Sequence, residues 1–305
     1  MQQVTGINYS LVGLMMKKNM YLCKVMRALR TEIEVELIPL YAPSEARNIA
    51  EALLMHILQL DRTHLLIYHG SPSPEQLADL KQATKRLAQG EPLQHIMGYT
   101  EFHGARFKVT GDVLIPRPET EELVEWILRV YDDSPRRVLD IGTGSGCIAI
   151  SLAKARPHWQ VHAIDISPAA LDIAANNARW NGANVSFHQA DILTLQDAET
   201  YDIIVSNPPY IAPSEQADMH INVLQYEPHL ALFAPEDDPL LFYRHIVLYA
   251  QHHLAASGGL FLEINQRLGK DTCTMIESNT HLKTMLKKDM QGNDRMVFGC
   301  FENAK

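Results

Sequence analysis

Lysine and arginine are in the minority among the charged residues of this 305-residue chain: 27 of them stand against 36 Asp and Glu, for a formal net charge of −9. Proteins that bind DNA or RNA contact the phosphates with an excess of basic residues. The composition therefore argues against general nucleic-acid binding and leaves open a local basic patch. We expect no specific nucleic-acid partner.

Cysteine is scarce as well: the chain has four, and none is spaced as C-x-x-C. Neither a zinc site nor a disulfide framework is indicated, which fits a reducing cytoplasm. The pair His252-His253 resembles a metal-binding pair, but adjacent helical residues face different ways and no Cys or acidic cluster supports it. We expect no bound metal and a cytoplasmic location.

Long hydrophobic runs are absent, so no segment is predicted to cross a membrane and we expect no membrane partner. Residues 7–16 are mildly apolar, but the basic pair Lys17-Lys18 follows them rather than preceding them, unlike in a signal peptide. We interpret residues 1–19 as a disordered leader or as the product of an upstream start codon.

Residues 20–90 have a helical pattern. After Ser44, apolar residues recur at helical spacing, and we predict Ser44 as the N-cap of that helix. Further on, Ser73-Pro74-Glu75-Gln76 combines a capping box with proline at the first helical position. These helices predict a small bundle. Because nothing in it looks catalytic, we interpret it as a docking or lid domain.

Residues 91–117 change character, because Gly98, Gly104 and Gly111 separate short stretches of aromatic and β-branched residues. Such stretches predict paired short strands, a β-hairpin that links the bundle to the rest of the chain. The hairpin leads into Pro116-Arg117-Pro118, whose two prolines make the chain rigid and extended. A helix then opens the domain of residues 118–305.

From residue 137 onward, apolar runs of strand length alternate with helical segments. The expected strands are 138–141, 161–164, 185–188, 203–205 and 260–264. The expected helices include 147–155, about 239–254 and one that runs towards Trp180 with Ser167-Pro168 as its cap. Such alternation predicts an α/β fold with a doubly wound, mostly parallel sheet covered by helices. Residues 289–301 predict an antiparallel edge hairpin around Gly292-Asn293.

A glycine-rich turn follows the first of these strands and consists of Gly142, Thr143, Gly144, Ser145 and Gly146. Glycines there let a ligand approach the backbone, and the N–H groups at the helix start face that ligand. In a dinucleotide fingerprint the third glycine falls one position later, and a Walker loop ends in GKS or GKT. The turn therefore fits neither of those classes.

Acidic residues follow the next two strands. Asp165 is placed to accept hydrogen bonds from both hydroxyls of a ribose. Asp191 is placed to accept one from an adenine amino group, although a role as a loop residue or turn cap fits about equally well. The order strand, GxGxG, helix, strand, acid predicts a site for a nucleoside cofactor.

The strand at 203–205 ends in Ser206-Asn207-Pro208-Pro209-Tyr210. Neither proline can donate a backbone hydrogen bond and each restrains the residue before it, so Asn207 and Pro208 are predicted to be stiff and extended. The Asn207 side-chain oxygen and the Pro208 carbonyl can then accept the two N–H bonds of an NH2 group. Taken alone, the same letters fit a surface turn equally well.

Together these residues resemble the class I methyltransferases, in which DxGxGxG holds the methionine end of S-adenosyl-L-methionine and an acid after the second strand holds the ribose. NPPY after the fourth strand narrows the resemblance to enzymes that methylate a planar amide or amine nitrogen. The chain also resembles the HemK/PrmC family of protein-(glutamine-N5) methyltransferases in Glu101-Phe102-His103-Gly104, in residues 114–121 and in Tyr226-Glu227-Pro228. The similarity covers nearly the whole chain from about residue 42.

This resemblance implies a Rossmann-like domain that uses S-adenosyl-L-methionine to methylate the glutamine in the GGQ motif of peptide chain release factors. It implies catalytic roles for Asn207, Pro208 and Tyr210, with Tyr210 packed against the flat amide and Asn207 also near the cofactor. The residues that it assigns to the substrate are Asn207, Pro208, Pro209, Tyr210, Phe102, Arg117 and Glu121. Of these, Arg117 and Glu121 would fix the hairpin over the site.

The chain departs from the family at Ile192, where an aromatic residue often follows the acid and helps to sandwich adenine. Ile192 can still pack on the ring by apolar contact. We therefore keep it, with Asp191, among the cofactor-binding residues.

Three other functions fit parts of this pattern. A DNA amino-methyltransferase shares NPPY and flips its base out of the duplex, but it usually carries a separate basic target-reading region. A non-enzymatic cofactor-sensing or ribosome-associated module would have no use for an intact NPPY sequence. A nicotinamide oxidoreductase is disfavoured by the glycine spacing.

Overall fold

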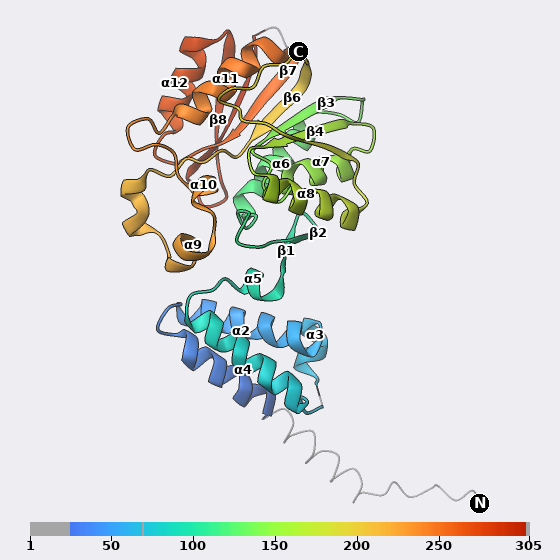
Figure 1. The fold of residues 1–305 in the computed structure, drawn as a ribbon, viewed down its shortest axis with the longest axis vertical. Coiled ribbons are helices and arrows are strands. Elements are labelled where there is room, and N and C mark those ends of the chain that lie inside the picture. Colours follow the sequence, from blue (N-terminus) through green and yellow to red (C-terminus); the bar gives the residue numbers. More distant parts are fainter. Residues whose placement is uncertain (1–24, 69, 303–305) are drawn as a thin grey trace, which may run out of the picture. The chain divides into compact units, whose positions relative to one another are not determined.

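The computed structural model describes residues 25–68 and 70–302 (Figure 1). The chain divides into two compact units, with the boundary between Met97 and Gly98. The leader expected at residues 1–19 lies outside the described residues.

The first unit is helical. Residues 25–37 form a helix, which is followed by α2 (Pro43–Leu58), α3 (Arg62–Leu66), α4 (Pro74–Ala88) and α5 (Leu93–Met97). The centre of its core is made of leucines that are at most 1% exposed, namely Leu37, Leu53, Leu54 and Leu87.

Two helix caps were predicted in this unit. Ser73 accepts a hydrogen bond from the N–H of Gln76, and the Gln76 side chain accepts one from the N–H of Ser73, so the capping box before α4 is confirmed. The prediction for Ser44 is wrong, because α2 begins at Pro43 with Ala42 as its N-cap and no side-chain cap. Proline suits the first helical position, since its φ is fixed and it has no N–H to satisfy.

The strands β1 (Tyr99–Phe102) and β2 (Ala105–Lys108) pair as an antiparallel hairpin. The two residues of its turn, His103 with φ 48° and Gly104 with φ 70°, adopt the left-handed conformation that a two-residue hairpin turn requires. The start of the expected linker differs, because α5 is a helix where strands were predicted. The hairpin belongs to the second unit.

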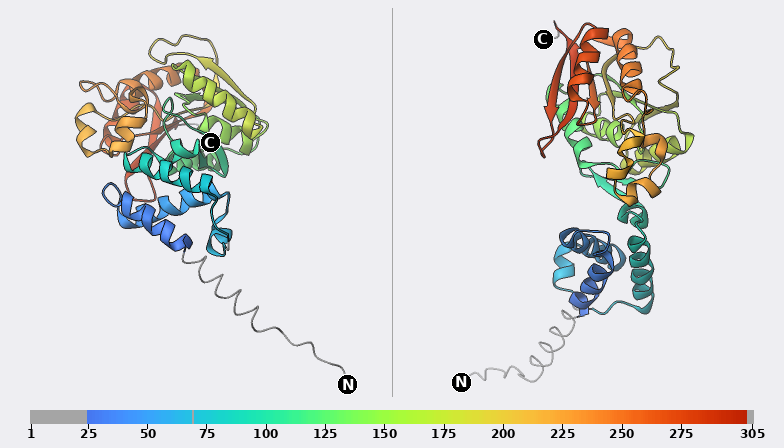
Figure 2. Two further views of the ribbon diagram at one scale, coloured as in Figure 1. Left: turned by 60° about the horizontal axis from the view of Figure 1, so that its bottom comes forward. Right: turned by 90° about the vertical axis from the view of Figure 1, so that its left-hand side faces the viewer.

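A seven-stranded sheet forms the centre of the second unit (Figures 1 and 2). Its strands are β3 (Arg137–Ile141), β4 (Gln160–Asp165), β5 (Val185–Gln189), β6 (Tyr201–Ser206), β7 (Leu254–Glu263), β8 (Leu282–Lys288) and β9 (Asp294–Phe301). The spatial order is β5-β4-β3-β6-β7-β9-β8. Strand β9 is antiparallel to β7 and β8, and the other pairings are parallel. The predicted doubly wound, mostly parallel α/β fold is confirmed.

The central strands are continuous apolar runs because helices cover both faces of the sheet. Ile203, Ile204 and Val205 of β6 are all 0% exposed, as expected for a parallel strand in this position. The chain proceeds from β3 to β4 and β5 on one side and later returns to β6 on the other side of β3. The strand order therefore reverses between β3 and β6, where folds of this kind bind their ligands.

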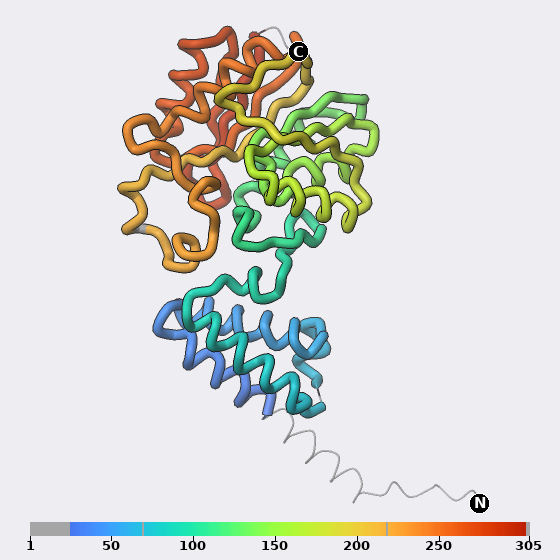
Figure 3. The backbone as a smooth tube through the Cα atoms, in the orientation of Figure 1, coloured from blue at the N-terminus to red at the C-terminus, as the bar shows by residue number. Residues whose placement is uncertain are grey.

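Two hydrophobic cores lie on the two faces of the sheet. Helices α6 (Pro118–Val130) and α7 (Cys147–Ala155) pack into one core, and α11 (Leu241–His253) and α12 (Gly269–Asn279) into the other. Helix α8 (Pro168–Asn181) contacts α7, β4 and β5, and its predicted cap is confirmed, since Ser167 accepts a hydrogen bond from the N–H of Ala170. Between β6 and α11 the chain makes an excursion through η1 (Pro213–Asp218), α9 (Ile221–Tyr226) and α10 (His229–Leu232), yellow to orange in Figure 3.

The C-terminal hairpin begins earlier than its sequence pattern predicts. The pattern places both strands within residues 289–301, but β8 consists of Leu282–Lys288 and residues 289–293 form the connection. Strand β8 lies at the edge of the sheet. Lysines such as Lys283, Lys287 and Lys288 protect an open edge against pairing with other chains, and they also weaken the strand pattern.

Candidate active site

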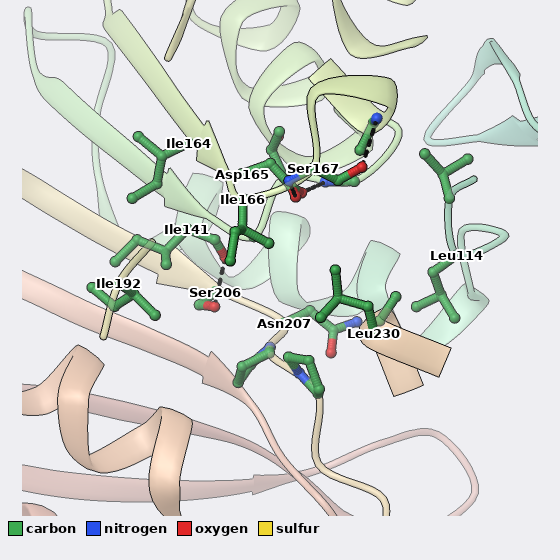
Figure 4. A pocket seen from close by; sticks show the side chains of 18 of the residues that line it. Leu114, Ile141, Ile164, Asp165, Ile166, Ser167, Ile192, Ser206, Asn207 and Leu230 are labelled. Carbon is green, nitrogen blue, oxygen red and sulfur yellow. Dashed lines mark hydrogen bonds between the residues drawn. The ribbon is translucent and has the colours of Figure 1, made fainter. Parts of the chain in front are cut away.

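A pocket lies at the carboxyl ends of β3, β4 and β6, where the strand order reverses (Figure 4). Its walls come from the loops after these strands, from the segment before α6 and from the segment around α10. The lining residues are 112–114, 116, 120, 141–145, 147, 148, 164–167, 170, 190–193, 206–209, 228, 230, 231, 242 and 246. Most of the predicted cofactor residues therefore meet at one site.

The glycine-rich turn between β3 and α7 forms one wall. Gly142 and Gly144 have φ values of 72° and 54°, and a Cβ added to either would meet nothing within 4 Å. Thr143 and Ser145 also line the pocket. Gly146 does not line it, because it is the N-cap of α7 and packs against α8. The turn thus leaves open space where a ligand can approach its backbone.

Asp140, the last residue but one of β3, is completely buried beneath this turn. Its Oδ2 accepts hydrogen bonds from the Thr143 hydroxyl at 2.7 Å and the Ala149 N–H at 3.3 Å. Burial raises the pKa of Asp140 to about 7. Among the described residues Oδ1 has no hydrogen-bond partner. The carboxyl group therefore shapes the turn and keeps one acceptor unused.

Asp165 ends β4 and lines the pocket. Its Oδ2 accepts a hydrogen bond from the Gly144 N–H at 2.8 Å and its Oδ1 accepts one from the Ser167 N–H at 2.9 Å. Burial raises the pKa of Asp165. Each carboxylate oxygen has a further lone pair, so Asp165 can tie the glycine turn to the start of α8 and still accept from ligand hydroxyls.

Asp191 and Ile192 line the pocket beyond the end of β5. The Oδ1 of Asp191 accepts a hydrogen bond from the Leu193 N–H at 2.9 Å, which is the turn-capping role that the sequence left open. Ile192 provides apolar lining, as do Ile141 and Ile164 (Figure 4). The pocket thus offers an apolar region beside two carboxylates.

The NPPY segment follows β6. The hydroxyl of Ser206 donates to the carbonyl of Ile141 at 2.7 Å and joins the ends of β6 and β3. Asn207, Pro208 and Pro209 line the pocket, and Figure 4 shows Asn207 across from Asp165. The Asn207 Nδ2 donates to the Thr120 hydroxyl oxygen at 3.3 Å. Its Oδ1 has no hydrogen bond among the described residues and is available as an acceptor.

Tyr210 does not line the pocket. Its hydroxyl donates to Oε1 of Glu263 at 3.2 Å, and its ring packs against the core beneath α11. Glu263, at the end of β7, is 1% exposed, and its Oε2 accepts a hydrogen bond from the Thr120 hydroxyl at 2.7 Å. Burial raises the pKa of both Tyr210 and Glu263.

Three other residues assigned to the substrate are not brought to the pocket. Phe102 is 1% exposed and meets Phe107 edge to face with 5.9 Å between ring centroids, so it is a core residue. Arg117 forms an ion pair with Glu227. Glu121 has no hydrogen bond or ion pair among the described residues. Core packing therefore fixes the side chain of Phe102, and the ion pair with Glu227 fixes that of Arg117.

Sequence reasoning also missed several residues of the site. Thr120 stands between two glutamates and carries no motif signal, and the family resemblance includes Glu227 without giving it a role. Glu263 had a usable signal, because an acid that interrupts the buried run 260–264 must have buried partners. Leu230, which is 58% exposed and lines the pocket, had none.

Comparison with known proteins places this chain in a family. The family model described as "PrmC N-terminal domain" matches residues 34–98, and the one described as "Methyltransferase small domain" matches residues 121–226. The "Release factor glutamine methyltransferase" of Flavobacterium psychrophilum is 44% identical over 277 residues, which cover 88% of this chain and 96% of the relative. The chain belongs to the release factor glutamine methyltransferase family.

A relative of the same name from Bacteroides thetaiotaomicron is 43% identical and covers 89% of this chain and 99% of its own length. The resemblance to the HemK/PrmC family is thereby confirmed, and the chain is a methyltransferase. Among solved structures, the hMettl16 catalytic domain in complex with MAT2A 3'UTR hairpin 6 aligns with a TM-score of 0.54 at 15% identity, over 76% of this chain and 83% of that one. That likeness concerns the fold alone.

Two features are absent from the part of the chain that the structure describes. No helix there has the length and apolarity to span a membrane. No group of three or more His, Cys, Asp or Glu side chains in the same part of the chain could hold a metal ion.

Proposed function

We propose that this protein transfers the methyl group of S-adenosyl-L-methionine to the side-chain amide nitrogen (N5) of the glutamine in the GGQ motif of peptide chain release factors. The proposal is carried by Asn207, which lines the pocket with its Nδ2 engaged by Thr120 and its oxygen left to accept from a substrate. The names of the curated relatives support release factors as the substrate.

The pocket fits S-adenosyl-L-methionine. Gly142 and Gly144 leave open space at their Cβ positions, which suits the methionine end. The carboxylate of Asp165 is proposed to accept from the ribose hydroxyls, and Asp191 and Ile192 to contact adenine. When bound, the cofactor supplies a methyl group that positive sulfur makes electrophilic and that leaves a neutral thioether behind.

The substrate amide is the weaker reactant, because its nitrogen shares its lone pair with the carbonyl. In our proposal the Asn207 oxygen and the Pro208 carbonyl accept the two N–H hydrogens and turn the face of the nitrogen towards the methyl group. Both acceptors favour the positive charge that develops on nitrogen during attack. The methylated nitrogen then loses a proton to water, so the reaction needs no strong general base.

Pro209 and Tyr210 are proposed to hold the acceptors in position without direct contact with the reacting atoms. Pro209 stiffens the backbone that carries both acceptors. Tyr210, whose hydroxyl is bound to Glu263 at 3.2 Å, anchors the segment to β7. The carboxyl ends of β6 and β7 thus hold the acceptors in place.

Incubation of the purified protein with methyl-labelled S-adenosyl-L-methionine and three separate acceptors tests this function. The acceptors are intact release factor, release factor with the GGQ glutamine replaced, and duplex DNA. We expect label on intact release factor alone. Label on DNA, or on none of the three, would reject the proposal, and label on the glutamine-replaced factor would reject the assigned position.

A further inference from the structure

A chain of buried polar groups lies beneath Asn207. The Asn207 Nδ2 donates to the Thr120 hydroxyl oxygen at 3.3 Å, and the Thr120 hydroxyl donates to Glu263 Oε2 at 2.7 Å. The other carboxylate oxygen of Glu263 accepts from the Tyr210 hydroxyl at 3.2 Å. Thr120 is 2% exposed and Glu263 is 1% exposed. These hydrogen bonds connect the first turn of α6, the end of β6 and the end of β7.

The direction of these hydrogen bonds follows from the chemistry of the groups. An ionised carboxylate has no proton to give, so Glu263 can only accept. Thr120 has one hydroxyl proton, and it donates that proton in its hydrogen bond to Glu263. The hydroxyl oxygen of Thr120 can then only accept a further hydrogen bond. Asn207 must therefore present its NH2 group to Thr120 and its oxygen to the pocket. A carboxylate that the substrate never touches thus determines which end of the amide faces the substrate.

This direction matters because the two ends of an asparagine amide have nearly the same shape. Without these hydrogen bonds, rotation of the Asn207 side-chain amide by half a turn would place its NH2 group in the pocket. Two NH2 groups would then face each other, and the acceptor for the substrate N–H would be lost. We propose that Thr120 and Glu263 are positioning residues that hold the oxygen of the Asn207 amide towards the substrate nitrogen.

The surroundings of Glu263 support its role as the fixed acceptor. Its backbone carbonyl accepts from the Tyr243 hydroxyl at 3.3 Å, which fixes the end of β7. Burial leaves the pKa of Glu263 raised on balance, and the hydrogen bond from Thr120, the positive charge of Arg295 and the hydrogen bond from Tyr210 offset only part of that effect. Arg295 lies on β9, the neighbour of β7 in the sheet.

The inference rests on the proposed function for its substrate, but the hydrogen-bond chain can be tested with and without that substrate. The central variants are Thr120→Val, which keeps the side-chain shape and removes the hydroxyl, and Thr120→Ser, which restores the hydroxyl. Thr84→Val is the matched control, since Thr84 is 4% exposed and lies in α4 of the other unit. Calorimetric affinity for S-adenosyl-L-methionine and thermal unfolding accompany each rate.

For Thr120→Val we expect kcat on release factor to fall about tenfold, the effect of one lost hydrogen bond. Cofactor affinity should stay within about twofold of wild type, and Thr120→Ser should recover most of the rate. In an Asn207→Ala background Thr120→Val should cause no further loss, since both changes remove the same function. Full additivity, or wild-type kcat in Thr120→Val, would overturn the inference.

A second readout does not depend on turnover. In 15N-labelled protein the side-chain NH2 resonances of Asn207 can be assigned by their absence in Asn207→Ala. We expect Thr120→Val to shift them and to speed their exchange with solvent, and Thr120→Ser to preserve them. Unchanged resonances in Thr120→Val would overturn the inference even if release factor proves not to be the substrate, and shifted ones would sustain it in that case.

Discussion

Arg117 and Glu227, 110 residues apart in the chain, form an ion pair in which the Glu227 side chain is 1% exposed and that of Arg117 is 35% exposed. The second carboxylate oxygen of Glu227 accepts the Ile115 N–H at 3.0 Å. The pocket lining includes residues 112–114 and 116 from the first segment and residues 228, 230 and 231 from the second. The pair therefore holds two walls of the pocket together, which is a different role from the one predicted for Arg117.

The two partners of this pair should differ in the cost of their removal. Arg117→Ala leaves a buried carboxylate without its cation and should destabilise the fold by about 3 kcal/mol. Glu227→Gln keeps an oxygen for Ile115, and the part-exposed Arg117 can bind water, so about 1 kcal/mol is expected. Urea unfolding measures both values, and calorimetry should show weaker cofactor binding in Arg117→Ala. Equal costs would mean that the pair is not anchored through the buried partner.

Asp165→Ala should weaken binding of S-adenosyl-L-methionine by roughly tenfold to a hundredfold, the range for lost hydrogen bonds to a charged group. Asp165 is the acid whose two oxygens already join Gly144 and Ser167, so some loss of stability is expected too. Asp172→Ala, an exposed site on α8, is the matched control. Unchanged affinity by calorimetry would leave Asp165 with its structural role alone.

Asn207→Ala should retain cofactor binding and lose methyl transfer by ~2–4 kcal/mol of activation free energy, typical of one preorganised polar group. The reason is that Thr120 engages the Asn207 Nδ2, so that in the proposed function the oxygen faces the substrate rather than the glycine turn. Single-turnover rates at saturating cofactor separate the two effects. Asn176→Ala, on the exposed side of α8, serves as control. A loss confined to cofactor affinity would contradict the assignment.

The sequence was most informative where one local rule decides the structure. The buried run of β6 predicts a central parallel strand, the turn of glycines predicts a ligand loop, and Ser73 and Ser167 predict helix caps; each depends on neighbours within a few residues. The sequence pattern does not predict β8 because this strand lies at the open edge of the sheet. Its lysines suit that edge but interrupt the apolar pattern of a buried strand. Ser44 was mistaken for a cap because Pro43 competes for the helix start.

The direction of side chains was harder to predict, because it depends on residues far apart in sequence. Phe102 and Tyr210 were assigned to the substrate from their motifs, but both point into the protein. Thr120 and Glu263 are 143 residues apart and meet only when α6 packs beside β7. A single sequence contains no record of that contact, so Thr120 and Glu263 could be connected with Asn207 only from the structure.

Gly146→Ala should be more harmful than its φ alone suggests. Gly146 has φ 81°, and a Cβ there would stand 2.8 Å from Ile150 Cδ1 and 3.1 Å from Ala174 Cβ. Gly182, at the end of α8 with φ 63°, would meet nothing within 4 Å, so Gly182→Ala carries the backbone strain without the clash. We expect about 1–2 kcal/mol for Gly182→Ala and roughly 1–3 kcal/mol more for Gly146→Ala, with weaker cofactor binding in the latter. Equal unfolding free energies for the two variants would show that α8 shifts to accommodate the added methyl group at Gly146 without loss of stability.

The buried carboxyl group of Asp140 should make the stability of the protein depend on pH. Burial raises its pKa from 3.8 to about 7, so the folded state binds this proton more tightly than the unfolded chain does. As pH rises through that interval, the unfolded state gives up its proton first, and the folded state loses stability.

Asp140→Asn should remove this dependence, because the asparagine oxygen can still accept from the Thr143 hydroxyl and the Ala149 N–H. The measurement is the free energy of urea unfolding of both proteins, without cofactor, from pH 4 upward. We expect the stability of Asp140→Asn relative to wild type to increase as pH rises from about 4 to about 7 and to level off above it. A difference that stays constant with pH would mean that Asp140 ionises in the folded protein as readily as in the unfolded chain.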